Sequence, residues 1–132
     1  MAEASAASER LHASRMTSQY CTFCQLVAGN LPIRKVYEDD EILVFHNQLH
    51  WVPVMLLIIP KVHMTQEEVW QSGDLLGRMG QKAVELGEEH CPRGYRVLAN
   101  FGADAVQSQH HGHLHVIGGA HLGLYVRNPL EY

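Results

Sequence analysis

Apolar residues follow two different spacings along this chain, and these spacings predict its strands and helices. Short runs in which apolar residues alternate with polar ones, or follow one another without interruption, predict β-strands. Such runs cover residues 33–37, 41–46, 54–59, 95–99 and 111–117. Pro60 ends the third run, which is apolar throughout and therefore typical of a strand that is buried on both faces.

The helical spacing occurs first near the start of the ordered sequence. Phe23, Leu26 and Val27 lie three and four positions apart, which predicts a short helix. Gly29 and Asn30 are residues that commonly end a helix, so about two turns are expected.

A longer helix is predicted after the third strand. Thr65 and Glu68 have the spacing of a capping box, and Asp74 stands where this longer helix can begin. Its apolar stripe consists of Leu76, Met79, Ala83 and Leu86. The order of elements predicts an α+β fold, in which a five-stranded antiparallel sheet carries one long and one short helix on one face.

Length and charge limit the kinds of protein that this chain encodes. Its 132 residues suffice for one domain, which we expect over residues 19–132 after a disordered, Ala- and Ser-rich tail at residues 1–18. A net charge of −4 without a basic cluster makes nucleic acid polymers poor partners. The chain has no apolar stretch of membrane-spanning length, and we expect no secretory signal and a cytoplasmic location.

Three histidines stand two residues apart near the end of the chain. His111, His113 and His115 would share one face if this stretch were a strand, with neighbours roughly 6–7 Å apart along the backbone. Three such imidazoles can grip one anionic group or share one metal ion. A histidine-rich tract without a common role is the other interpretation.

Two of the three cysteines form a C-x-x-C pair. Cys21 and Cys24 make this pair and Cys91 stands alone, which does not resemble a secreted disulfide framework. In a reducing compartment the pair suits a metal clip or a redox site. Two reduced thiols packed as small apolar side chains are the alternative.

The histidine pattern and its flanking motifs resemble the histidine triad superfamily of nucleotide hydrolases and transferases, and within it the Hint-like branch. The resemblance runs from about Tyr20 to Gly119. The motifs that carry it are Cys21-Thr22-Phe23-Cys24, Leu31-Pro32, Val36-Tyr37-Glu38-Asp39-Asp40, Ile59-Pro60-Lys61-Val62-His63, Asn100-Phe101-Gly102-Ala103-Asp104 and His111-Gly112-His113-Leu114-His115-Val116-Ile117.

This resemblance implies a catalytic set. His113 takes the position of the nucleophile that attacks the α-phosphorus of a nucleotide and forms a nucleotidyl-histidine. His115 is expected to donate a hydrogen bond to a nonbridging oxygen, and His111 is the first histidine of the set. Ser108, with its hydroxyl, and Gln107 occupy the position of phosphate and leaving-group contacts.

The resemblance also implies where the rest of the nucleotide lies. Asn100 matches a side chain on the leaving-group side, although Asn100 and Ser108 also suit ordinary loop turns. Phe45 and Phe23 offer apolar walls for a base, and each is equally suited to the core. Asn47 stands where the family usually has an Asp that reaches the ribose hydroxyls.

A structural zinc site is implied by a likeness to some bacterial Hint-like proteins. Cys21, Cys24, His63 and His111 would supply two thiolates and two imidazoles, the ligands that Zn²⁺ prefers. A site closed by four protein ligands is structural. His111 would then leave the phosphate and fasten the N-terminal segment to the sheet.

Two positions depart from the family pattern. Met55 stands where relatives commonly have a further active-site histidine, and methionine cannot donate a hydrogen bond to phosphate. His50, in the neighbouring loop, is a candidate to replace that missing histidine. Gly112 replaces a bulkier apolar residue, which predicts looser packing behind the histidine strand.

Three functions are consistent with these residues. The first is hydrolysis of purine nucleoside 5′-phosphoramidates or related adenylates, by a homodimer that contacts through its long helix and fourth strand, residues 95–99. The second is a nucleotide-binding or scaffold protein with weak or vestigial activity, favoured by Met55 and Asn47. Hydrolysis of dinucleoside polyphosphates is an alternative to the reaction of the first. The third is a metal hydrolase in which the three triad histidines hold a catalytic zinc.

Overall fold

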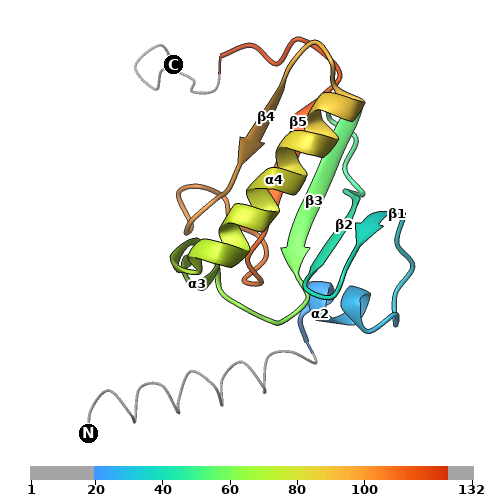
Figure 1. Cartoon of the computed structure of the whole chain (residues 1–132). Coiled ribbons are helices and arrows are strands. Elements are labelled where there is room, and N and C mark those ends of the chain that lie inside the picture. Colours follow the sequence, from blue (N-terminus) through green and yellow to red (C-terminus); the bar gives the residue numbers. More distant parts are fainter. Residues whose placement is uncertain (1–19, 125–132) are drawn as a thin grey trace, which may run out of the picture.

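The protein folds around a single antiparallel sheet, which the computed structural model describes within residues 20–124. The strands lie in the order β1-β2-β3-β5-β4, and each neighbouring pair is antiparallel (Figure 1). Their bounds are β1 (Lys35–Glu38), β2 (Ile42–His46), β3 (Val54–Pro60), β4 (Tyr95–Leu98) and β5 (Leu114–Gly118). The α+β fold with a five-stranded sheet is therefore confirmed, although the fifth strand begins at Leu114 and not at residue 111.

Three helices occur in the described residues, one more than the sequence predicted: α2 (Thr22–Val27), α3 (Gln66–Gln71) and α4 (Gly73–His90). The additional helix α3 is the segment that the capping box opens. The Thr65 hydroxyl accepts from the Glu68 amide, and the Glu68 carboxylate accepts from the Thr65 amide. The backbone then leaves the helical region at Ser72, where ψ is 84°, so α4 starts separately.

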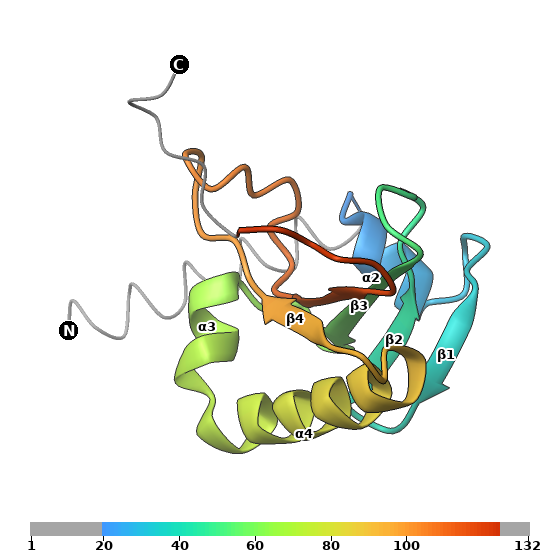
Figure 2. The same ribbon diagram turned by 90° about the horizontal axis from the view of Figure 1, so that it is seen from above.

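The two faces of the sheet have separate cores, because β2 and the following strand β3 are apolar at successive positions. One core lies under α4 and includes Ile42, Val44, Leu56, Ile58, Met79 and Val116. The other lies under α2 and includes Phe23, Leu43, Phe45, Leu57 and Ile59. The expectation that the helices share one face is therefore wrong: α3 and α4 lie on one side and α2 on the other (Figure 2).

The tail predicted for residues 1–18 lies outside the described residues, so the domain boundary at residue 19 stays a prediction. Between residues 20 and 124, none of the helices combines the length and the apolar character that crossing a membrane requires.

Candidate functional site

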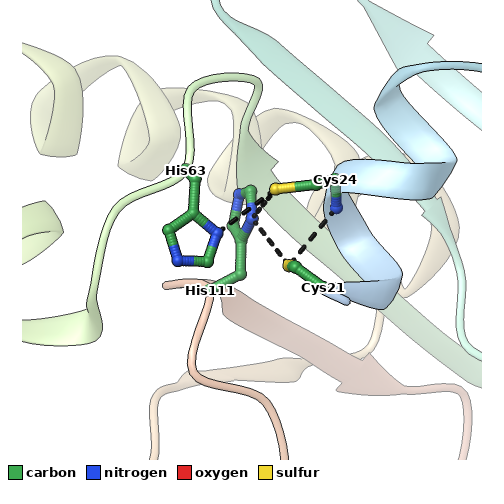
Figure 3. A group of neighbouring side chains, drawn as sticks. All are labelled: Cys21, Cys24, His63 and His111. Atoms are coloured by element: carbon green, nitrogen blue, oxygen red, sulfur yellow. Dashed lines mark hydrogen bonds between the residues drawn. The ribbon is translucent and has the colours of Figure 1, made fainter. Parts of the chain in front are cut away.

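Four metal-ligating side chains from three distant segments meet at one end of the sheet (Figure 3). Cys21 and Cys24 flank the first turn of α2, His63 follows β3, and His111 precedes β5. The Sγ atom of Cys24 lies 3.2 Å from His63 Nδ1 and 3.5 Å from His111 Nδ1, and Cys21 Sγ lies 3.4 Å from His111 Nδ1. One ligand atom from each of the four residues lies within 4.8 Å of all the others.

This donor set fits a tetrahedral ion. Zinc–sulfur bonds of about 2.3 Å and zinc–nitrogen bonds of about 2.0–2.1 Å place tetrahedral ligand atoms roughly 3.3–3.8 Å apart. The three sulfur–nitrogen separations, 3.2, 3.4 and 3.5 Å, lie within that range or 0.1 Å below it. Burial and the neighbouring Cys21 raise the pKa of the Cys24 thiol to about 12, as expected for two adjacent sulfurs without a compensating cation.

The outer nitrogen of His111 is also engaged, which orients the ring. Its Nε2 lies 2.7 Å from the carbonyl oxygen of Pro60, so the N–H is on Nε2 and the lone pair of Nδ1 points to the sulfurs. His111 is fully buried, and this burial lowers its pKa to about 4, which keeps the ring neutral. One ring nitrogen faces the cysteine sulfurs and the other faces a backbone carbonyl, so neither is available to a phosphate. This is expected if His111 serves as a metal ligand.

His113 has one nitrogen fixed and one available. Its Nδ1 lies 2.8 Å from the carbonyl oxygen of His111, which can only accept, so Nδ1 carries the proton. The neutral ring therefore has its lone pair on Nε2. Only 3% of the side chain is exposed, and burial lowers the pKa of His113 below its usual 6.5. A neutral imidazole with a free lone pair is the form that a nucleophile requires.

His115 lies beside this nucleophile candidate. The ring centroids of His113 and His115 are 4.9 Å apart. Burial, and to a lesser degree His113, lower the pKa of His115 to about 4. Among the buried side-chain nitrogen and oxygen atoms of residues 20–124, only His115 Nε2 lacks a hydrogen-bond partner. A buried polar atom without a partner is costly, and such atoms often face a ligand.

Gly112 is the point at which the histidine segment contacts the start of α3. Its amide donates to the carbonyl of Met64 at 2.7 Å, and Thr65 forms an isolated β-bridge with His111. A Cβ atom at residue 112 would lie 2.5 Å from Val69 Cγ2 and 2.9 Å from the Thr65 carbonyl oxygen. The prediction of looser packing is therefore wrong, because glycine permits a close backbone approach here.

The loop before the triad places the other predicted phosphate contacts. Ser108 is exposed, and Asn100 is half-buried. The side chain of Gln107 is used inside the loop, since its Oε1 accepts from the Gly102 amide and its Nε2 donates to the Gln109 carbonyl. A contact from Gln107 to phosphate would therefore come from its backbone.

The expected nucleoside residues fall into two groups. The rings of Phe23 and Phe45 pack edge to face within the second core, with their centroids 5.6 Å apart. The Phe23 ring also packs edge to face with His113, at a centroid distance of 5.3 Å. Asn47 lines an open pocket at the β2–β3 turn together with His50 and Met55. Its Oδ1 accepts from the Leu49 amide at 3.0 Å, which leaves Nδ2 as its donor.

One functional candidate was missed by the sequence analysis. Gln66 is fully buried, and its Oε1 accepts a hydrogen bond from the backbone amide of His113 at 2.8 Å. No motif or periodicity marks a buried glutamine at the start of a helix. Only the neighbouring capping residue Thr65 indicated that an ordered turn begins here.

Comparisons with known proteins agree with the arrangement. The profile of the HIT domain matches residues 28–122. A HIT-like protein of Chlamydia muridarum is 37% identical over 107 residues, covering 76% of this chain and 82% of that protein. A HIT family hydrolase from Legionella pneumophila superposes with a TM-score of 0.72 at 33% identity, over 76% of this chain and 94% of that chain. A Zn-bound histidine triad family protein from Mycobacterium smegmatis has a TM-score of 0.66 at 28% identity, over 85% of both chains.

Proposed function

This chain belongs to the family of HIT-domain proteins, and from that premise we propose that it hydrolyses purine nucleoside 5′-phosphoramidates or related adenylates. The hydrolase from Legionella pneumophila, one of its structural relatives, supports a hydrolytic reaction in general. The substrate class and the covalent intermediate follow from the triad residues and are our proposal.

The unpartnered Nε2 atom of His115 is the observation that carries this proposal. It is buried next to a histidine whose own Nε2 has a free lone pair. A nucleophile and a hydrogen-bond site side by side suit phosphoryl chemistry, in which an attacking atom and a charged oxygen must be held together.

The reaction balances as two displacements on one histidine. The Nε2 atom of His113 attacks the α-phosphorus, which forms an N–P bond and breaks the bond to the leaving amine. The amine takes up a proton, for which the hydroxyl of Ser108 is the proposed relay. Water then attacks the same phosphorus, breaks the bond to His113 and returns a proton to the Ser108 oxygen, which regenerates the enzyme and releases the nucleoside monophosphate.

The other predicted contacts are assigned to parts of the nucleotide. His115 donates to a nonbridging oxygen, and Asn100 and the backbone of Gln107 lie on the leaving-group side. The rings of Phe23 and Phe45 form an apolar wall for the base. Asn47 donates to the ribose through Nδ2, because its Oδ1 is already bonded to the Leu49 amide.

We also propose that the four-residue cluster binds a structural zinc ion. The donor set, its spacing and the Zn-bound relative from Mycobacterium smegmatis support this site. When bound, the ion would supply the positive charge that two adjacent thiolates need. Cys21, Cys24 and His63 would hold α2 against His111. Four protein ligands leave no open coordination position for substrate.

Release of AMP from adenosine 5′-phosphoramidate tests the enzyme proposal. Wild-type protein should turn over, and His113→Ala should lose about 10³-fold or more of that rate. His110→Ala is the matched control, because it removes an exposed neighbouring imidazole outside the triad. Diadenosine polyphosphates, supplied in parallel, test the alternative substrate class.

A nucleotide-binding protein with weak activity is the second candidate, because Met55 offers no hydrogen bond to phosphate where the family has a histidine. That function predicts AMP binding by calorimetry with no turnover above that of His113→Ala. Such a result would replace the hydrolase proposal.

A further inference from the structure

Gln66 connects two backbone groups at the proposed active site. Its Oε1 accepts from the His113 amide at 2.8 Å, and its Nε2 donates to the Asn100 carbonyl at 3.1 Å. We propose that Gln66 is a positioning residue, which sets the nucleophile His113 relative to the loop that begins at Asn100. This inference rests on the proposed function of His113.

The end of the strand ladder explains why His113 needs this partner. The pairing of β3 with β5 stops at Ile58 and Leu114, so His113 lies just beyond it. A buried backbone amide without a partner is costly. The side chain of Gln66 takes the place that a neighbouring strand would otherwise fill.

The base of the side chain is itself held in place. Gln66 is the first residue of α3, directly after the capping residue Thr65. The same turn is joined to the histidine segment by the hydrogen bond from Gly112 to Met64. The amide group of Gln66 therefore projects from a turn that is already attached to the residues it orients.

Filling buried volume alone would not require glutamine. Methionine has a similar length and fills a buried site without needing hydrogen bonds. A buried amide is tolerated only when its donor and acceptor are both satisfied. Here both hydrogen-bond partners of Gln66 are backbone groups, of His113 and of Asn100, and we propose that these two residues contact the substrate. The role of Gln66 is therefore to orient them.

Kinetics of Gln66→Met test the inference. We expect kcat to fall about 10- to 100-fold, because small displacements of a nucleophile are costly, while the Kd for AMP changes by less than about twofold. Gln71→Met, the same change at an exposed position of α3, should leave both values unchanged.

A core variant separates orientation from loss of stability. Val44→Ala removes fully buried volume under α4, away from the triad. At a similar fall in Tm it should retain wild-type kcat. Equal loss of kcat in Val44→Ala and Gln66→Met, or wild-type kcat in Gln66→Met, would overturn the positioning role while leaving the hydrolase proposal intact.

Amide hydrogen exchange tests whether Gln66 holds the His113 backbone, even if wild-type protein shows no turnover. In Gln66→Met the His113 amide should exchange about 10-fold or more faster relative to the amide of Val116 in β5. Unchanged relative protection of His113 would show that Gln66 does not hold it, whatever the fate of the catalytic proposal.

Discussion

The Nδ1 atom of His113 donates its proton to the carbonyl oxygen of His111, 2.8 Å away. One triad residue thus fixes the tautomer of the next through its backbone, while its own ring points to the cysteines. We predict that nitrogen-15 NMR of the ligand-free protein at neutral pH finds a protonated Nδ1 and an unprotonated Nε2 in His113. The reverse tautomer would remove the lone pair that the proposed reaction needs.

Substitution of Gly112 should be destabilising despite the small size of the added group. A Cβ atom would meet Val69 and the Thr65 carbonyl at less than 3.0 Å, and the latter is backbone that cannot rotate away. We expect Gly112→Ala to lower the free energy of unfolding by about 1–3 kcal/mol, measured by urea denaturation.

Gly77→Ala is the matched control for that measurement. Gly77 lies in α4, and a Cβ atom added there would meet no atom within 4 Å beyond the backbone of its own helix. Alanine should stabilise the helix at this position by about 0.5–1 kcal/mol. If Gly112→Ala were equally stabilising, the close approach between α3 and the histidine segment would not exist in solution.

Metal analysis tests the cysteine–histidine cluster. We expect purified protein to contain zinc and the double variant Cys21→Ser/Cys24→Ser to lack it, whereas Cys91→Ser keeps it because that buried cysteine lies outside the cluster. Free zinc at about 1,000 times its Kd would add about 4 kcal/mol to stability, so a chelator should lower the Tm of wild-type protein. Zinc that survives the double substitution would place the ion at the triad.

The pH dependence of stability should include a contribution from His46. Burial, followed by the charges of Arg34, His90 and His50, holds the pKa of His46 below 6.5. The unfolded chain therefore binds a proton more readily, and stability falls as the pH drops from about 6.5 through the lower folded pKa. Urea denaturation at about pH 7.5 and about pH 5.5 should show a larger acid loss for wild-type protein than for His46→Gln.

A homodimer through α4 and β4 remains a prediction of the family resemblance. Val84 on α4 is 48% exposed and Val97 on the edge strand β4 is 42% exposed, so each leaves apolar surface for a partner. We expect Val97→Glu to yield monomers in light scattering after size exclusion. Leu49→Glu, a change of the same kind at the β2–β3 turn, should leave the dimer intact; dissociation by both would indicate a different contact.

The sheet and α4 were predictable because their apolar spacing is regular over whole elements. The placement of α2 was not, although the sequence contained the signal. Leu43 and Phe45 interrupt any alternation in β2, and a strand that is apolar on both faces needs a cover on each. Helix α2 is the element that covers Leu43 and Phe45 on the second face.

The triad was predicted as a strand and is only partly one. His111 pairs with Thr65 instead of β3, so period-2 geometry begins only at Leu114. The metal set was predictable because its residue types are distinctive. The role of Gln66 was not predictable, because it depends on the backbone amide of His113, which lies beyond the end of the pairing between β3 and β5. That position is a property of the fold.

The cysteines and His111 are separated by about 90 positions in the chain yet lie in contact. At a synthesis rate of about 5–20 residues per second, the two thiols are synthesised roughly 5–20 s before His111. During that interval α2 can pack only against the apolar side chains of β2 and β3, and the set of four donors lacks His111. The four donors of the cluster can therefore come together only after β1, β2, β3 and β4 have all been synthesised.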